Sequence, residues 1–318
     1  MGSPNRIIIT VHPHAPPMHE TWPNFFLVGA AKAGTTSLYE YLSRCPGVFF
    51  PRIKEPHFFT GVRPANERKF YIDAVTKREQ YLRLFRKARD SLVVGDASPS
   101  YLWHPQVPRR IYEVAPDARI AIILRDPVER AYSHYLMDYR EGVQDLPFYE
   151  ALIEDMNLPE KGWGISWLYF ELGQYARQVE RYYSVFKPEQ IKVLLFDEFS
   201  RDVRGTLKEI LEFLGLDPSV ADKIDVSRKY NVYSAPRGPI ARRLAGSKVS
   251  RFFGQTIIPR EVGEFVFYKF LVRDAVKPPI DPRARDLLSS LYEREVAATE
   301  KILGRPLPQL RRSWCAAA

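Results

Sequence analysis

The segment that follows the first apolar run of the chain carries residues suited to binding a phosphate group. Two glycines, Gly29 and Gly34, are separated by four residues, and Lys32 lies between them. A strand, a glycine-bounded turn and a helix in this order bring backbone N–H groups together at a helix N-terminus, where the partial positive charge favours an anion. The pattern therefore predicts an anion-binding loop. The alternative is a tight turn that uses glycine only for packing.

This loop differs from the Walker A loop of ATPases. In a Walker A loop, lysine follows the second glycine directly, and a serine or threonine that binds magnesium comes next. Here Thr35 and Thr36 follow Gly34, and the lysine lies in mid-loop. We interpret this as an anion cradle whose lysine reaches an oxygen between two anionic groups, rather than the far end of a triphosphate.

A second cluster of polar residues begins at Arg125. It follows the clearest apolar run of the chain, 119–124, and leads through Asp126 and Pro127 into a helical pattern that contains Ser133. Ligands of open parallel sheets collect at the carboxyl ends of the strands. Arg125, a planar donor fork, and Ser133, a hydroxyl donor, are therefore expected to converge on one anion. The alternative is a pair of surface ion pairs, Arg125–Asp126 and Glu129–Arg130.

Apolar runs and helical patterns alternate along the chain. Strands are expected at 24–28, 91–94, 119–124 and 191–196, and helices at 35–42, around 107–114, from 127 to about 139, and at 174–186, 203–214 and 279–303. This alternation predicts an α/β fold, a P-loop-like parallel sheet flanked by helices on both faces. We expect a single domain at 23–318, preceded by an irregular N-terminal arm at 1–22.

Composition limits the class of protein. The chain has 318 residues, of which 45% are hydrophobic and 27% charged, which is typical of a globular protein. No apolar run is long enough to cross a bilayer, and two cysteines, Cys45 and Cys315, do not make a disulfide framework. We therefore expect a cytoplasmic protein with no transmembrane segment. The net charge of +9 is concentrated at 228–260, which contains eight basic and no acidic residues.

Taken together, these motifs resemble those of PAPS-dependent sulfotransferases. Residues 28–38 and 125–133 look like the 5′-phosphosulfate and 3′-phosphate motifs of that family, in the order in which it has them. Further similarity lies at 54–59, 96–102, 173–175 and 303–307, and at Trp314. The resemblance is to the branch that contains heparan-sulfate and bacterial carbohydrate-type enzymes.

The resemblance implies a donor, a product and a set of residues that bind them. The donor would be PAPS and the product PAP, with no metal. Lys32 would neutralise the charge that builds on the bridging oxygen as the leaving phosphate departs. The loop residues Ala33, Gly34, Thr35, Thr36 and Ser37 would bind the 5′-phosphate through N–H groups and a hydroxyl, and Arg125 and Ser133 would bind the 3′-phosphate.

An alcohol acceptor is a poor nucleophile and needs a general base. The resemblance implies Glu55, in the segment Glu55-Pro56-His57-Phe58-Phe59, and His57 is the second candidate. In a strand-like segment, both side chains would point the same way. The alternatives are an ion pair of Glu55 with Lys54 or Arg52, and a hydrogen-bonded pocket histidine at His57.

The resemblance implies a carbohydrate or other alcohol as the acceptor, possible classes being a polysaccharide or other glycan, a glycolipid, a natural-product hydroxyl and a carrier-tethered chain. Nucleic acid is not expected as a partner. Asp96 and Ser98 are candidate acceptor residues, and the other role open to Asp96 is to hold a neighbouring base. Ala97 stands where heparan-type enzymes often have lysine. Trp163 and Trp167 are candidates for the acceptor site, with a packing role as their alternative. The segment with Tyr233, Arg237 and Gly238, with Lys229 before it, is expected to close over the nucleotide, although it departs from the family's Lys-Gly-Phe pattern.

Two other classes of function remain open at this point. One is a P-loop small-molecule kinase, which would need a lysine after Gly34 and a magnesium-binding carboxylate, for which only Asp96 is available. The other is a non-catalytic protein that binds nucleotides or polyanions through the loop and the basic stretch 228–260.

Overall fold

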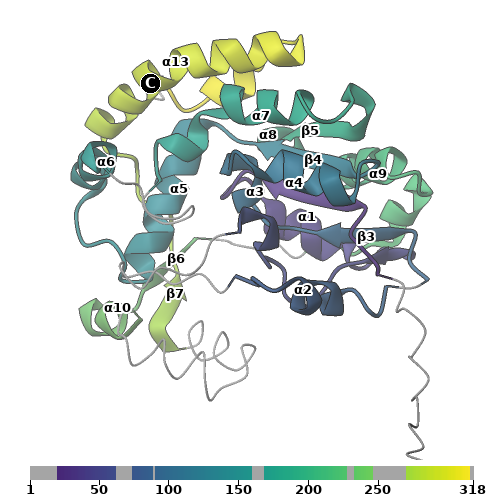
Figure 1. Ribbon diagram of the computed structural model, residues 1–318. Coiled ribbons are helices and arrows are strands. Elements are labelled where there is room, and N and C mark those ends of the chain that lie inside the picture. The colour runs from purple at the N-terminus through teal and green to yellow at the C-terminus, as the bar shows by residue number, and fades with distance from the viewer. Residues whose placement is uncertain are drawn as a thin grey trace, which may run out of the picture.

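Among the described residues, the central sheet has five strands, all parallel, in the order β2-β3-β1-β4-β5. Figure 1 labels β3, β4 and β5 of this sheet. The computed structural model describes residues 20–61, 74–88, 90–159, 168–227, 233–245 and 270–315. The strands are β1 (Phe25–Gly29), β2 (Val48–Phe49), β3 (Val93–Asp96), β4 (Arg119–Leu124) and β5 (Ile191–Leu195). The predicted α/β fold with a parallel sheet is confirmed. Strand β2 was not predicted, because two residues give no recognisable apolar run.

Helices cover both faces of this sheet, which explains why β1 is buried along its whole length. Helix α1 (Thr35–Leu42), which follows β1, contacts α9 (Val203–Phe213). Helix α3 (Ser100–Trp103) contacts α4 (Val107–Val114) and α7 (Tyr175–Tyr183). The chain passes from β1 to β2 in one direction along the sheet and from β3 to β4 in the opposite direction. Because such crossovers are right-handed, the helix α1 that follows β1 and the helices α3 and α4 that follow β3 lie on opposite faces.

The remaining helices surround the carboxyl edge and the periphery of the sheet. They are α2 (Arg78–Leu84), α5 (Pro127–Arg140), α6 (Phe148–Asn157), α8 (Phe196–Arg201), α10 (Pro239–Ala245) and α13 (Pro282–Leu303). Short 3-10 turns are η1 (Phe58–Thr60), η2 (Glu171–Gly173), η3 (Pro188–Gln190), η4 (Pro218–Lys223) and η6 (Pro308–Arg311). Helix α13, yellow in Figure 1, lies against α5 and α7.

A small antiparallel sheet lies beside α5. It consists of β6 (Ser234–Pro236) and β7 (Val272–Asp274), and β6 contacts α5. The sequence did not predict these strands because they are three residues long and not uniformly apolar. They matter here because β6 belongs to the segment expected to close over a nucleotide.

Most predicted helices agree with the structure to within a few residues. Helix α13 begins at Pro282 rather than at 279, because the Asp281 carboxylate accepts the N–H of Arg283 at 2.9 Å and caps the helix. Strand β3 begins two residues later than expected and ends in Asp96.

The described residues contain three hydrophobic clusters, and Trp314 packs against the two larger ones. Trp22, which the sequence placed in the arm, packs on the first cluster next to Phe59 and Tyr81; residues 1–19 lie outside the described part of the chain. Cys45 is buried and Cys315 exposed, both as free thiols. Within the ranges described, no helix combines the length and the apolar character that crossing a bilayer requires.

Candidate active site

The loop between β1 and α1 has the backbone geometry of an anion cradle. Lys32 has a φ of 67° and Gly34 a φ of 90°, so the chain turns sharply before α1. A Cβ on Gly34 would lie 3.0 Å from the Phe196 ring, so position 34 needs glycine for space as well as for its left-handed backbone. The N-cap residue of α1 is Gly34, which has no side chain to cap the helix. Its first N–H groups are therefore left without intrahelical acceptors.

The loop side chains divide into buried and accessible ones. Ala33 and Thr35 are buried, whereas Lys32, Thr36 and Ser37 are only partly covered. The hydroxyls of Thr36 and Ser37 are therefore the ones that a phosphate is able to reach. Because the Thr35 side chain is buried, its backbone N–H is the donor that this residue has left for a ligand.

The Lys32 ammonium lies over α5. Its Nζ is 3.3 Å from the Met137 sulfur, a weak hydrogen-bond acceptor. Burial lowers the pKa of Lys32 to about 8, and the positive charge of Arg140 adds to this effect, while Glu141 and Asp138 partly offset it. Lys32 is thus a cation at neutral pH, and no carboxylate among the described residues forms an ion pair with its ammonium. Such a cation is suited to binding an anionic ligand.

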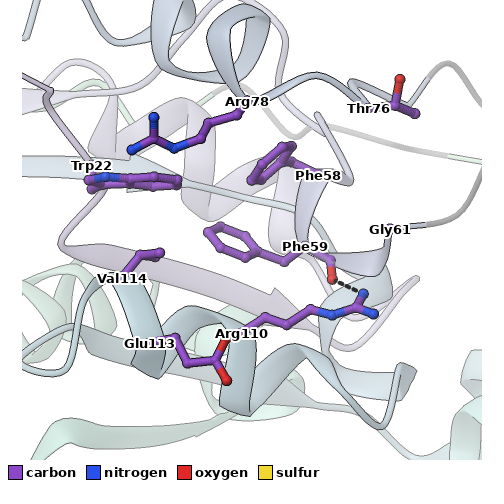
Figure 2. Close-up of a pocket in the computed structure, with 9 residues that line it drawn as sticks. All are labelled: Trp22, Phe58, Phe59, Gly61, Thr76, Arg78, Arg110, Glu113 and Val114. Carbon is purple, nitrogen blue, oxygen red and sulfur yellow. Dashed lines mark hydrogen bonds between the residues drawn. The ribbon is translucent and has the colours of Figure 1, made fainter.

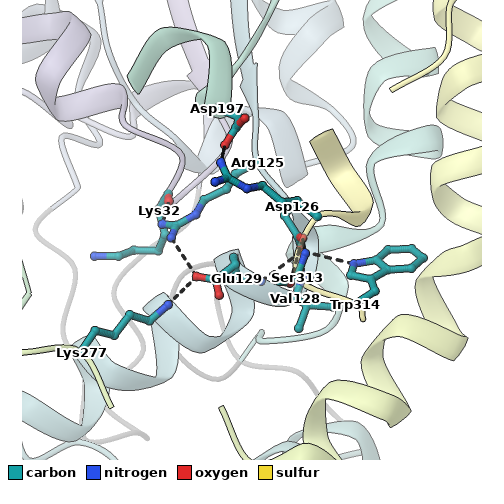
Figure 3. A network of polar contacts seen from close by, with 10 residues as sticks. Lys32, Arg125, Asp126, Val128, Glu129, Asp197, Lys277, Ser313 and Trp314 are labelled. Carbon is teal, nitrogen blue, oxygen red and sulfur yellow. Dashed lines mark hydrogen bonds and ion pairs between the residues drawn. The ribbon is translucent and has the colours of Figure 1, made fainter. Parts of the chain in front are cut away.

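Arg125 connects this loop to the second motif (Figure 3). Its Nη1 donates to the Lys32 carbonyl oxygen at 3.0 Å, and its Nη2 binds the Glu129 carboxylate at 3.2 Å. The guanidinium also lies 4.6 Å from the centre of the Phe196 ring. The alternative ion pairs Arg125–Asp126 and Glu129–Arg130 are not what forms: Arg125 pairs with Glu129, and Arg130 is fully buried and donates to the Tyr169 carbonyl.

The remaining residues of the second motif hold the helix in place. Ser133 is half-buried on α5, one face of which also carries Met137. Asp126 caps α5 by accepting the N–H groups of Val128 and Glu129. Its other oxygen accepts both the N–H and the hydroxyl of Ser313 at 2.8 Å. The chain near its C-terminal end thereby fixes the start of α5 and the position of Arg125.

Glu55 is oriented by two neighbours. Its Oε1 forms an ion pair with Lys54, the pairing that the sequence offered as an alternative role, and its Oε2 lies 3.6 Å from His57 Nε2. Burial alone would raise the pKa of Glu55, but the Lys54 charge, with contributions from His57 and Lys32, outweighs it and lowers the pKa. Glu55 is therefore ionised at neutral pH, and its side chain keeps 35% exposure.

The expectation that Glu55 and His57 share a strand is wrong. Residues 50–57 form no regular strand, and His57 has a left-handed backbone with φ 53° at the start of η1. The two side chains meet because the chain turns at His57, not because of strand alternation. Sequence reasoning had no signal for that turn, since histidine seldom adopts positive φ.

His57 is a buried neutral imidazole. It is 3% exposed, its Nδ1 lies 2.7 Å from the Ser100 hydroxyl, and its backbone N–H donates to the Ser98 hydroxyl at 3.2 Å. Burial lowers the pKa of His57 to about 4, although Glu55 acts in the opposite direction. His57 thus matches the hydrogen-bonded alternative, and its Nε2 faces Glu55.

Asp96 and Ser98 are both fully buried, which places them out of contact with an acceptor. The Asp96 carboxylate accepts hydroxyls from Ser98 and Tyr81 at 2.7 Å and from Tyr101 at 2.9 Å. Burial raises the pKa of Asp96 to about 6, although these hydrogen bonds oppose the change. These contacts match the second role expected for Asp96, that of holding a neighbouring base: Asp96 holds Ser98, which in turn holds the backbone of His57. The two tyrosines carried no sequence signal for this role.

The segment around β6 lies next to α5. Ser234 accepts a hydrogen bond from Arg140 at 3.2 Å, Tyr233 is half-buried, and Arg237 is exposed. A Cβ on Gly238 would meet open space, so close packing does not explain that glycine. Lys229, Trp163 and Trp167 lie outside the described residues. In the described part of the basic stretch, Arg242 stacks on the Tyr139 ring at 3.9 Å and pairs with Asp145, which is a packing role.

Two cavities flank these residues. One, of about 320 Å³, is lined by Arg125, Asp126 and Glu129 together with residues of α8 and η6, at the carboxyl edge of β4 and β5. The other, of about 570 Å³, lies behind η1 among Trp22, Phe58 and Phe59 (Figure 2). Neither lining includes Lys32 or Glu55. Arg125 lines only the smaller cavity, which makes that cavity the one relevant to an anionic ligand.

Comparison with known proteins agrees with this geometry. Residues 23–220 match the model of the Sulfotransferase family. A solved sulfotransferase from Alicyclobacillus acidocaldarius is 31% identical, with a TM-score of 0.70, and the match covers 92% of this chain and 100% of that one. The predicted resemblance and fold are thereby confirmed.

Curated relatives include enzymes that act on carbohydrates. Human carbohydrate sulfotransferase 15 is 28% identical over 275 residues, which cover 70% of this chain and 48% of that protein. Human heparan sulfate glucosamine 3-O-sulfotransferase 6 is 26% identical over 243 residues, which cover 76% of this chain and 64% of that protein. The chain thus spans about half to two thirds of the length of these relatives.

Proposed function

Because the chain belongs to the Sulfotransferase family, we propose that it transfers a sulfuryl group from PAPS to a hydroxyl group of a carbohydrate. The observation that carries this proposal is the hydrogen bond between Arg125 and the Lys32 carbonyl. It joins two anion-binding motifs into one surface, so a donor with a charged group at each end of its ribose has a partner for both.

The loop residues match the phosphosulfate end of such a donor. The donor supplies a sulfur bonded through oxygen to its 5′-phosphate. The uncapped N–H groups of α1 and the hydroxyls of Thr36 and Ser37 bind the phosphate, with Ala33 and Gly34 shaping the turn. The Lys32 ammonium neutralises the charge that grows on the bridging oxygen as its bond to sulfur breaks.

Glu55 acts as the general base. An ionised, partly exposed carboxylate is able to take the proton of an acceptor hydroxyl as the acceptor oxygen bonds to sulfur. The phosphate leaves with the bridging oxygen as PAP. His57 contacts no acceptor because it is buried, and we assign it the role of fixing the carboxylate of Glu55 through Nε2.

The second motif binds the other end of the donor. Arg125, assisted by Ser133, holds the 3′-phosphate, which ordinary adenine nucleotides lack. Tyr233, Arg237 and Gly238 lie on the segment next to α5 and complete the nucleotide site. No metal is required by this set of residues, because cations and N–H groups supply the charge stabilisation.

The acceptor is proposed from the relatives, two of which are named for carbohydrate substrates. A glycan or a glycolipid fits this assignment, and Trp163 and Trp167 remain candidates for stacking on a sugar ring. The test is transfer of ³⁵S from labelled PAPS to a panel of desulfated glycans, glycolipids and simple alcohols. We expect label in a carbohydrate product and none when Glu55→Gln replaces the wild type. Transfer of ³²P from γ-labelled ATP, with no transfer of sulfur, would contradict the proposal in favour of a kinase.

A further inference from the structure

Two cations from distant parts of the chain converge on one carboxylate oxygen. Arg125 Nη2 and Lys277 Nζ both bind Oε2 of Glu129, and Figure 3 shows this carboxylate lying between the two cations. Lys277 comes from the segment between β7 and α13, 148 positions after Glu129. From the sequence, Glu129 was expected only in an alternative surface ion pair with Arg130, and Lys277 had no predicted role.

Contacts other than the carboxylate hold both cations in place. Arg125 also binds the Lys32 carbonyl and lies over the Phe196 ring. Lys277 Nζ lies 4.8 Å from the centre of the Tyr132 ring. The two positive charges would therefore remain close together if the Glu129 side chain turned away, and a second anion would be needed between them.

The Glu129 carboxylate is able to turn away from the two cations into solvent, so its own charge would not be left buried and unpaired. Its side chain is 29% exposed and borders the cavity of about 320 Å³ beside Arg125. A phosphate dianion in its place would carry more charge and more acceptor oxygens to the same two cations. The exchange therefore replaces the Glu129 carboxylate by an anion that carries more charge and more acceptor oxygens.

We propose that Glu129 occupies the position of the donor's 3′-phosphate in the ligand-free protein, and that Lys277 is a second cation that receives this phosphate together with Arg125. The inference rests on the proposed function, because it assigns the 3′-phosphate to Arg125. It makes Glu129 a source of selectivity: an adenine nucleotide without a 3′-phosphate has no group that displaces the carboxylate.

The test is calorimetric titration of the full chain with PAP and with adenosine 5′-monophosphate. Glu129→Gln keeps the shape of the side chain and removes the competing charge, so it should strengthen PAP binding about tenfold. Lys277→Met should weaken PAP binding about tenfold, because a charge-assisted hydrogen bond is lost. Affinity for adenosine 5′-monophosphate should change less than about twofold in both variants.

Glu150→Gln, which removes a carboxylate that pairs with Arg283 on α13, is the matched control and should leave PAP binding unchanged.

The sign of the Glu129→Gln effect decides the inference. If this variant binds PAP more weakly than wild type, or equally well, Glu129 only orients Arg125 and the inference is wrong. That result is independent of whether Lys277→Met folds. If wild-type protein itself does not prefer PAP to adenosine 5′-monophosphate, the proposed function fails and this inference fails with it.

Discussion

Arg125 and Lys32 lie 93 positions apart in the sequence and are joined by a hydrogen bond of 3.0 Å, from the guanidinium of one to the backbone carbonyl of the other. The bond is made to the main chain, so it fixes the loop while leaving the Lys32 ammonium unengaged by Arg125. The Lys32 ammonium instead lies 3.3 Å from the sulfur of Met137 on α5. The two phosphate motifs are thus held in fixed relation before any donor binds.

Lys32→Met should reduce sulfuryl transfer far more than donor binding. The charge that Lys32 meets develops mainly in the transition state, so we expect kcat to fall about 10²–10³-fold and PAP affinity to fall less than about tenfold. The measurements are ³⁵S transfer at saturating PAPS and calorimetric titration with PAP. Lys192→Met, on β5 and paired with Glu209, is the control. Equal losses of binding and turnover would make Lys32 a simple anchor.

Glu55→Gln should abolish transfer while the donor still binds. Loss of a general base costs about 10²–10⁴-fold in rate, and the amide keeps the size of the side chain. PAP affinity, measured by titration, should stay within about twofold of wild type. Glu40→Gln, at an exposed pair with Arg44, serves as the control.

His57→Gln distinguishes a positioning residue from a base. Since His57 is buried and neutral, its replacement should lower kcat by only about tenfold and leave the acidic limb of the pH–rate profile at the pKa of Glu55. A loss as large as that of Glu55→Gln, with disappearance of that limb, would instead make His57 the base.

The lowered pKa of Lys32 predicts proton uptake on binding. Lys32 is charged below about pH 8 in the free protein, and an anionic ligand raises its pKa again. Titration with PAP at about pH 9, in buffers of different ionisation enthalpy, should show uptake of about one proton more than Lys32→Arg shows. The unfolded chain keeps this proton up to the ordinary value of 10.5, so Lys32 alone makes the free energy of unfolding rise with pH between 8 and 10.5. Equal uptake by both proteins would contradict the pKa assignment.

Asp96→Asn should destabilise the fold in a pH-dependent way. The carboxyl holds its proton up to about pH 6 in the folded protein and up to 3.8 in the unfolded chain, so its contribution to stability declines as pH rises between these values. We expect a loss of about 1–3 kcal/mol at pH 5 and a loss about 1 kcal/mol smaller at pH 7, measured by urea unfolding. Tyr81→Phe, which removes one of the three hydroxyls, should show a smaller loss. A larger loss at pH 7 than at pH 5 would contradict the raised pKa.

The sequence predicted the parts of this molecule that depend on local pattern. Strands such as β4 and helices such as α1 follow from apolar runs and turn residues within a few positions. The glycine-bounded loop and Arg125 were found because their chemistry depends on residue types at short spacing. The cytoplasmic setting and the absence of a metal stay predictions, as do the roles of Trp163 and Trp167.

What the sequence missed depends on contacts between distant segments. Nothing in the local sequence indicates that Met137 lies beneath Lys32, that Ser313 binds Asp126, or that Lys277 reaches Glu129. At Asp96 the sequence left two roles open, contact with the acceptor and support of a neighbouring base, and only the structure shows that three hydroxyls enclose the carboxylate. Exposure cannot be inferred from residue type alone, because a buried carboxylate with enough hydrogen bonds is stable.

The most direct test of the account is a crystal structure of the protein with PAP bound. We expect the 5′-phosphate to lie against the N–H groups at the start of α1, within hydrogen-bond distance of Lys32 Nζ, and the 3′-phosphate to lie on Arg125. Nucleotide bound anywhere else, including the cavity lined by Trp22 and Phe58, would contradict it.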